Sequence, residues 1–286
     1  MRSLFARISL ALFALAALVV TASPAFAQRD PPISKELLER VGDWAEAYLD
    51  SSPNFAAEET LSQTQREKHG GVARRIVCDY FSLRLASSPR DRSEFRDVLS
   101  VDGKEIQSTA KREAKWPRLV GAQSSREFSA LVEGPGKYAL APEQFSGLDR
   151  LAGRLAVRYQ DRMRYFYAQD TSETPSRNVL IGYRQQSGEG LVVVDGKAVP
   201  VSGQAWVDPD TGRIVRIEEE VNSKVARYWI AVDFADAPPL DAWLPSAITV
   251  RVFEKGRLAL ESAYSYSNFR LLVPDRRADS AASSKP

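Results

Sequence analysis

The stretch from Gly203 to Val221 reads GQAWVDPDTGRIVRIEEEV, and it decides the fold class. Apolar and polar side chains alternate on both sides of a central DPDTG segment, Asp208 to Gly212. Alternation with a period of two is typical of a β-strand that buries one face. Within the DPDTG segment, proline presets one backbone dihedral angle and glycine supplies positive φ. The stretch therefore predicts two antiparallel strands joined by a tight turn.

The same alternation continues through the C-terminal half of the chain. The string ARYWIAVDF at 226–234 and the segments that begin at 248 and 258 each place apolar side chains on one parity. Short turns punctuate the strands at Asp102-Gly103, Asp195-Gly196 and Lys255-Gly256, where a type I′ turn needs positive φ. We therefore expect an antiparallel meander with one continuous apolar face. The side chains expected on that face are Tyr228, Ile230, Val232, Val250, Val252, Leu258, Leu260 and Tyr264.

Two amphipathic helices are predicted beside these strands. The first lies in ISKELLERVGDWAEAYLDSSP, where Ser34 can cap the helix, Pro53 can end it, and apolar residues recur at three- and four-residue steps. The second is short and lies in SSREFSALVEGPG, with Ser125 as a possible cap and Gly134-Pro135-Gly136 as its end. An apolar sheet face with two such helices available to cover it predicts a mainly β, α+β fold, a curved sheet wrapped around both helices.

The two ends of the chain differ from the rest. Residues 1–27 carry two arginines, an apolar run from Ile8 to Val20 and Ala25-Phe26-Ala27, which predicts a secretory signal peptide cleaved after Ala27. The apolar run is shorter than the roughly 20 residues that a spanning helix needs, so no transmembrane span is expected after cleavage. We expect one domain at 28–274, a polar disordered tail at 275–286, and a periplasmic or secreted protein.

Composition argues against several classes of function. The chain has 39 basic and 37 acidic residues, and the predicted signal peptide removes two basic ones, so no nucleic-acid partner is indicated. One histidine, His69, and one cysteine, Cys78, are too few for a usual zinc site or a disulfide, and no serine sits in a nucleophile elbow. The DPDTG turn lacks the further ligands of a calcium loop. We therefore expect no metal, no cofactor and no enzymatic activity, with a carboxylate-dependent glycan-active enzyme left open as an alternative.

Two charged segments have competing interpretations. Glu218, Glu219 and Glu220 are interpreted as a solvated strand edge. The segment RLAVRYQDRMRYFY at 154–167 is interpreted as a strand pair, with Arg158, Arg162 and Arg164 on one parity and aromatic side chains on the other. Its arginines form either a basic row for anionic headgroups or a polyanion, or the wet side of an ordinary sheet, which we favour.

The central hairpin resembles a known family. A strand that ends in Trp206-Val207-Asp208, a Pro-Asp-Thr-Gly turn and the return strand RIVRIE are similar to the central hairpin of the bacterial outer-membrane lipoprotein carrier and receptor (Lol-type) superfamily. Leu244-Pro245 before SAITVRV resembles another recurring feature of that superfamily. The segments SPNFAAEETLSQTQR and EFSALVEG look like a group of secreted bacterial proteins of the same fold. The resemblance implies an antiparallel half-barrel whose concave face is plugged by helices and can hold acyl chains.

The function predicted from these features is binding of a hydrophobic ligand, a lipid or a lipidated protein, in the cell envelope. The eight side chains of the apolar face are the expected wall of its site. The same face can also be an ordinary core filled by the helices, which leaves a periplasmic interaction or sensor module as the alternative.

Overall fold

The computed structural model describes residues 31–67, 70–85, 92–122, 124–141, 148–168, 177–194 and 196–272. The side chains of residues 67 and 148–150 are not part of this description. The predicted signal peptide, the predicted tail and His69 lie outside the described residues. Contacts divide the chain after Asp30, and the account below concerns the unit that begins at Pro31.

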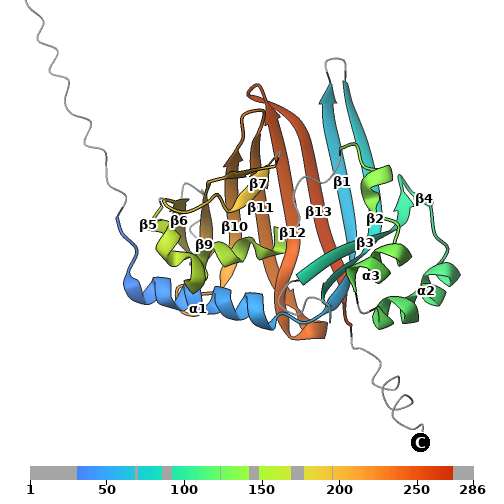
Figure 1. The fold of residues 1–286 in the computed structure, drawn as a ribbon, viewed down its shortest axis with the longest axis horizontal. Helices are drawn as coiled ribbons and strands as arrows, with labels where there is room; N and C mark the ends of the chain where they lie inside the picture. Colours follow the sequence, from blue (N-terminus) through green and yellow to red (C-terminus); the bar gives the residue numbers. More distant parts are fainter. Residues whose placement is uncertain are drawn as a thin grey trace, which may run out of the picture. The chain divides into compact units, whose positions relative to one another are not determined.

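Eleven strands of the described chain form one antiparallel sheet (Figure 1). In spatial order they are β4 (Lys104–Glu105), β3 (Arg92–Val101), β2 (Gly70–Arg84), β1 (Phe55–Glu67), β13 (Arg257–Leu271), β12 (Ala242–Glu254), β11 (Arg227–Ala237), β10 (Ile214–Asn222), β9 (Val201–Val207), β6 (Val179–Gln185) and β5 (Met163–Tyr167). A separate hairpin consists of β7 (Val192–Val194) and β8 (Lys197–Val199).

One helix precedes β1, and the other helices lie in connections between strands. The helices are α1 (Lys35–Ser51), α2 (Thr109–Gly121), α3 (Ser125–Leu131) and the short 3₁₀ helices η1 (Pro135–Lys137), η2 (Leu148–Leu155), η3 (Val157–Arg162) and η4 (Pro238–Leu240). As predicted, Ser34 caps α1, its side chain accepting a hydrogen bond from the Leu37 amide at 3.3 Å.

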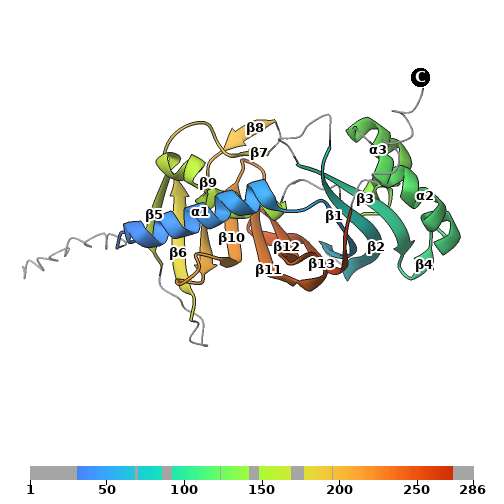
Figure 2. The same ribbon diagram turned by 90° about the horizontal axis from the view of Figure 1, so that it is seen from below.

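The sheet is an open meander whose two halves are joined by its first and last strands. Most strands pair with their neighbours in sequence, and β13 pairs with β1 from Phe55 opposite Leu271 to Gln65 opposite Leu260. The outermost strands, β4 and β5, do not pair with each other, so the sheet does not close into a barrel. Figure 2 shows the curvature of the sheet, with α1 lying across one face. The predicted antiparallel, half-open fold is confirmed.

The turns predicted from local sequence are present in the described residues. Both central residues have positive φ at Asp102-Gly103 and at Lys255-Gly256, as type I′ turns require. Asp195 lies outside the described residues, while Gly196 has a φ of 71°. In the DPDTG turn Gly212 has a φ of 72°, and an added Cβ there would come within 2.5 Å of the Arg40 carbonyl oxygen of α1. Glycine therefore serves both the turn and its close approach to the helix.

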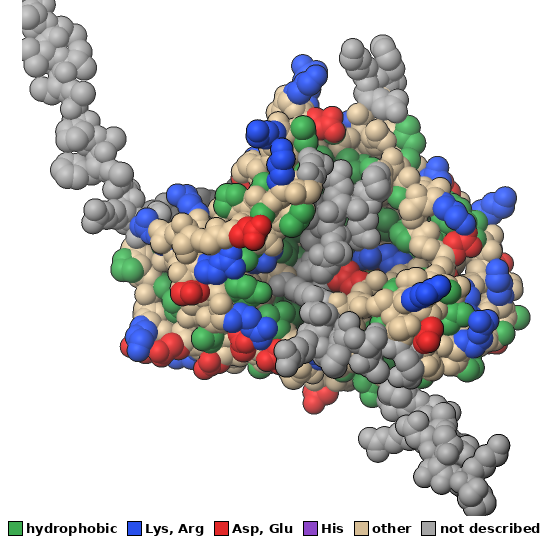
Figure 3. All heavy atoms as spheres, in the orientation of Figure 1, with side chains coloured by type: hydrophobic (Ala, Val, Ile, Leu, Met, Phe, Trp, Pro, Cys, Tyr) green, Lys and Arg blue, Asp and Glu red, His purple; other side chains and the backbone are tan. Residues whose placement is uncertain are grey.

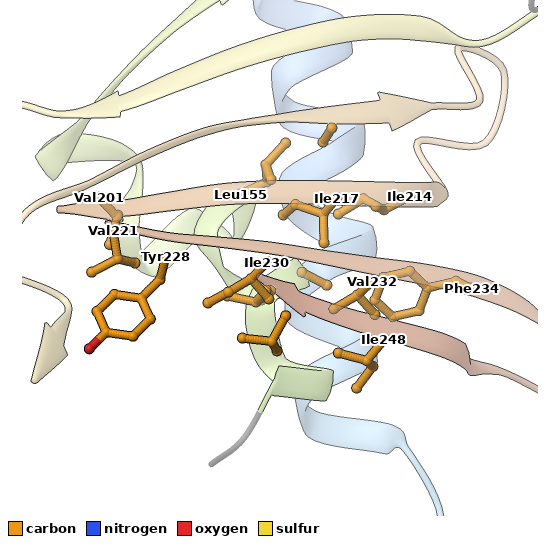
Figure 4. Packing of buried hydrophobic residues seen from close by; sticks show 14 of the residues in the cluster. Leu155, Val201, Ile214, Ile217, Val221, Tyr228, Ile230, Val232, Phe234 and Ile248 are labelled. Atoms are coloured by element: carbon orange, nitrogen blue, oxygen red, sulfur yellow. The ribbon is translucent and has the colours of Figure 1, made fainter. Parts of the chain in front are cut away.

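The face of the sheet that α1 covers, here called the inner face, carries the main core. Leu37, Val41 and Ala45 of α1 are buried against it, together with Leu151, Ala152 and Leu155 of η2. Figure 4 shows side chains of β9 to β12, among them Ile217 and Ile230, on the same side of their strands as Leu155. Away from this core, Figure 3 shows acidic and basic side chains interspersed along α1.

The second predicted helix lies on the opposite, outer face, which differs from the expected arrangement. Phe128 of α3 is buried against Phe81 and Phe95, and Leu119 of α2 belongs to the same cluster. Phe81 alternates with Ile76 of the inner core along β2, so the two clusters lie on opposite faces. The physical reason is that β2 is apolar on both parities near its end, and its outer face needs a cover of its own.

Charged groups also hold α2 to the outer face. Asp79 and Asp97 lie directly opposite each other on β2 and β3, and both are buried. Arg112 donates to Asp79 at 2.5 and 2.6 Å, and Lys115 donates to Asp97 at 2.6 Å. These cations from α2 offset the repulsion between the two facing carboxylates.

Candidate ligand-binding face

The predicted wall residues mostly come together on the inner face. Six of them belong to the main buried cluster with at most 8% of each residue exposed, namely Tyr228, Ile230, Val232, Val250, Val252 and Tyr264. Leu260 is partly buried and packs against that cluster. Leu258 is partly exposed, does not belong to it, and pairs with Phe253 just beyond a bulge near the β12–β13 turn. The alternation in the sequence therefore placed most of these side chains on one face of the sheet. Their shared position does not depend on whether that face binds a ligand.

Two kinds of cover lie over this wall. Near β10 to β12 the cover includes η2, which also packs against α1. A second cover is the β7–β8 hairpin, in which Val194 is buried in the main cluster while Leu191, Val192 and Val199 pack against it. This hairpin pairs with none of the eleven strands of the main sheet. It is therefore held to the wall by side-chain packing rather than by a backbone ladder.

A buried ion pair lies within the inner face at β10. Arg154 of η2 donates from Nε to Glu219 Oε2 at 2.8 Å, and Tyr183 Oη donates to the same oxygen at 3.3 Å. Burial would lower the pKa of the Arg154 guanidinium, but the charge and hydrogen bonds of Glu219 raise it above its ordinary value. Burial, followed by the Glu219 charge, raises the pKa of Tyr183 well above its ordinary value.

The burial of Glu219 corrects the interpretation of the three glutamates as a solvated edge. Glu219 is fully buried, whereas Glu218 and Glu220 point to the outer face and are partly exposed. Gly203 makes room for this arrangement, because an added Cβ would overlap the Glu218 carbonyl oxygen and come within 2.5 Å of Tyr183 Oη. The charge of Glu219 is compensated by Arg154, which comes from another segment of the chain.

A second buried ion pair lies further along the inner face, between β1 and β3. Arg96 donates from Nε to both carboxylate oxygens of Glu59, at 2.8 and 3.0 Å. The Arg96 guanidinium also lies 5.1 Å from the ring centre of Tyr80 and 5.7 Å from that of Tyr264. Cys78 is fully buried in the inner core; burial, and then the Glu59 charge, raises the pKa of its thiol.

An amide and a hydroxyl extend this polar patch along β1 and β13. Gln63 donates from Nε2 to Ser262 Oγ at 3.1 Å and accepts from the Leu140 amide at 2.8 Å. Both side chains are buried. Their polar atoms are thus satisfied within the protein, and the surrounding surface remains apolar.

Sequence reasoning missed these charged groups, although one signal was present. Glu219 lies between Ile217 and Val221, and Glu59 lies between Ala57 and Leu61, each at a position where alternation calls for an inward side chain. A charge at such a position must find a partner, since an unpaired buried charge is very costly. The alternation therefore indicates that these two carboxylates point inward, but it does not identify Arg154 or Arg96 as their partners.

The inner face is an apolar wall that includes the two buried ion pairs and the Gln63–Ser262 hydrogen bond. Among the described residues no three His, Cys, Asp or Glu side chains are grouped so that they could hold a metal ion. No helix within the described ranges is both long enough and apolar enough to cross a membrane. Such a wall suits an apolar ligand if a cover can move aside.

Comparisons with known proteins gave matches among solved structures only. No protein-family model matches the chain, and no curated protein matches it by sequence. Solved structures of similar fold include an outer membrane lipoprotein-sorting protein domain from Vibrio parahaemolyticus, at 11% identity and a TM-score of 0.36 over 85% of this chain and 94% of that chain. A LolA superfamily protein from Nitrosomonas europaea is 12% identical, with a TM-score of 0.34 over 82% of this chain and 93% of that chain. A DUF1329 family protein from Desulfovibrio piger is 12% identical, with a TM-score of 0.35 over 82% and 90%. These neighbours include the superfamily that the central hairpin resembles.

Proposed function

We propose that this protein binds a hydrophobic ligand, a lipid or the acyl chains of a lipidated protein, against the inner face of its sheet. We place this activity in the cell envelope and propose that it involves no catalysis. The observation that carries the proposal is the β7–β8 hairpin, which packs against the apolar cluster that contains the wall without pairing with the main sheet. A cover of this kind can leave the wall while the sheet itself stays intact.

The energetics of exchanging the hairpin for a ligand are favourable. Lifting the hairpin exposes Val194, whose burial stabilises the closed form by about 1.5–3 kcal/mol, and it also exposes the partly buried Leu191, Val192 and Val199. An acyl chain gains about 0.8 kcal/mol for each methylene that it removes from water. About four methylenes on the wall therefore offset the loss of Val194, and further methylenes must offset the three partly buried side chains before a longer chain adds net affinity. The backbone ladder of the main sheet contributes nothing to the cost, because it is not broken.

The polar groups of the inner face support binding without catalysis. Glu59 and Glu219, its buried carboxylates, are each engaged by an arginine. A carboxylate occupied in this way favours a structural role over that of an acid or base in a glycan-active enzyme. The two ion pairs also leave the wall without net charge, which suits a neutral acyl chain.

The test combines extraction with a matched pair of variants. Protein purified from the envelope is analysed for bound lipid by mass spectrometry, and binding of a fluorescent fatty acid is measured for wild type, Leu260→Glu and Leu271→Glu. Leu260 packs against the wall, whereas Leu271 lies on the same strand and is 53% exposed. We expect Leu260→Glu to weaken binding and Leu271→Glu to leave it unchanged, with circular dichroism confirming that both fold. Absence of bound lipid together with equal fluorescence for all three proteins would refute the proposal.

A second candidate is an interaction or sensor module whose inner face is a permanent core. The observation in its favour is that six wall residues are already buried by the chain's own side chains. Under this alternative the fatty acid does not bind, and hydrogen exchange in β7 and β8 is as slow as in the neighbouring strands. Fast exchange of the hairpin that slows when fatty acid is added favours the first candidate instead.

A further inference from the structure

Arginines without carboxylate partners gather on the outer face at the β5–β6 end of the sheet. Arg164 of β5 and Arg184 of β6 lie directly opposite each other in the register, and both are exposed. Neither forms an ion pair with any residue that the structure describes. Like charges directly opposite each other across two strands are destabilising. The pairing is therefore unfavourable unless an anion lies between them.

Other arginines on the same outer face are compensated. Arg216 pairs with Asp233 and Glu218, Arg227 pairs with Glu220, and Arg251 pairs with Glu261. Each of these three also lies over an aromatic ring, of Trp206, Phe253 and Trp229 respectively. Against this background the pair formed by Arg164 and Arg184 is an exception, because no described residue neutralises it.

A groove beside this pair crosses the neighbouring strands, and Arg184 is the member of the pair that lines it. It has a volume of about 270 Å³ and is lined by Phe166, Arg184, Ser202, Gln204, Glu220 and Trp229, among others. Ser202 lies opposite Arg184 in the register, so its hydroxyl and the guanidinium belong to one cross-strand row. The Phe166 ring lies over Gly182, where an added Cβ would overlap it. Gly182 thus lets the ring form one wall of the groove.

The groove is charged in opposite senses at its two ends. Arg184 stands at the β6 side, while Glu218, Glu219 and Glu220 stand on β10, where they pair with Arg216, Arg154 and Arg227 respectively. The second end is unsuitable for another anion, but its carboxylates and the Gln204 amide can bind hydroxyl or amino groups. The volume suits a small molecule rather than a polymer segment.

We propose that this groove binds a small phosphate ester. The phosphate lies between Arg164 and Arg184 and also accepts from the Ser202 hydroxyl, since guanidinium groups match the geometry of phosphate oxygens. The organic part of the ester lies between Phe166 and Trp229, with its hydroxyl or amino groups directed toward β10. Such an ester is either a free metabolite or the headgroup of a phospholipid. The site lies on the face opposite to the acyl wall and does not depend on the function proposed above.

This assignment recovers part of the basic row considered from the sequence. The prediction of a strand pair over 154–167 is correct only for 163–167, which form β5. Residues 154–155 end η2 and 157–162 form η3, and Arg158 pairs with Glu46 and Asp50 of α1 instead. Arg164 remains on the outer face, and its partner in the site, Arg184, comes from another strand.

The test uses titration calorimetry with glycerol 3-phosphate, phosphoethanolamine and inorganic phosphate, and sedimentation with vesicles of phosphatidylethanolamine and phosphatidylglycerol. The variants are Arg164→Gln, Arg184→Gln and, as control, Arg66→Gln, an exposed arginine at the far end of β1. We expect each site variant to weaken phosphate binding about tenfold or more, because a hydrogen-bonded charge is lost. The control should bind as wild type does.

A purely structural role is separated by thermal unfolding without ligand. Removal of a repelled charge should leave the unfolding temperature of Arg184→Gln equal to or above that of wild type, while the rise that phosphate causes in wild type disappears. Binding of soluble esters identifies a free ligand, and arginine-dependent binding of vesicles alone identifies a lipid headgroup. The proposal is overturned if neither binds, or if both site variants bind as tightly as the control.

Discussion

Loss of Arg154 is the sharpest test of how the inner face is held together. Glu219 is fully buried, and the Arg154 side chain is only 16% exposed. Arg154→Met removes the cation while keeping much of the side-chain volume. It leaves a buried carboxylate that, among the described residues, keeps the Tyr183 hydroxyl at 3.3 Å as its partner. Breaking a buried pair in this way costs about 3–5 kcal/mol of unfolding free energy.

The double variant Arg154→Met, Glu219→Met tests whether the stranded charge causes the loss. Replacing both partners of a buried pair by apolar side chains is often neutral or stabilising. Tyr183 keeps an acceptor in this variant, since its hydroxyl also donates to the Glu218 carbonyl at 3.2 Å. We therefore expect the double variant to be at least about 2 kcal/mol more stable than Arg154→Met alone.

Urea unfolding followed by circular dichroism provides the measurement. A loss of about 3–5 kcal/mol corresponds to a midpoint lower by roughly 1–2 M urea at the slopes usual for proteins. The control is Arg158→Met, whose ion pairs with Glu46 and Asp50 are solvent-exposed and should contribute about 0.2–1 kcal/mol. If Arg154→Met costs no more than Arg158→Met, or if the double variant is as unstable as the single one, the reasoning about Glu219 is wrong.

Three further predictions concern single positions. Gly203→Ala should lower the unfolding free energy by about 1–3 kcal/mol, because the added Cβ overlaps the Glu218 carbonyl and overpacks the site. The control Gly121→Ala, at the open end of α2, should not lower the unfolding free energy. Cys78 should resist an aromatic disulfide reagent at pH 8 until urea unfolds the protein, since burial raises the pKa of its thiol; rapid labelling of native protein would contradict this. Hydrogen bonds from the Thr211 and Asp210 amides lower the pKa of Asp208 below its usual 3.8. Its contribution to stability is therefore present above that pH and lost as the pH falls through the folded-state pKa, so the difference in melting temperature between wild type and Asp208→Ala should shrink from pH 7 to pH 2.

The strands and their turns were predictable because their causes are local. A period of two fixes which side chains share a face, and an Asp-Gly or DPDTG turn fixes where the chain reverses, whatever lies around it. The wall from Tyr228 to Tyr264 was therefore placed on one face before any contact was known. The cap of α1 at Ser34 was predictable for the same reason.

The tertiary structure decided what local pattern leaves open. An amphipathic helix needs an apolar partner but does not specify which, so only packing against Phe81 and Phe95 puts α3 on the outer face. Residues 157–162 alternate like a strand, yet contacts with α1, including the Gln160 amide donating to the Leu38 carbonyl, hold them as η3.

The charged groups show the same division between sequence and structure. The sequence by itself determined that Glu59 and Glu219 point toward the inner face, because their positions follow the period of the strand. Only the tertiary structure could make them tolerable there, by bringing Arg96 and Arg154 from 37 and 65 residues away. A buried charge depends on a partner in space, and separation along the chain says nothing about which residue that partner is.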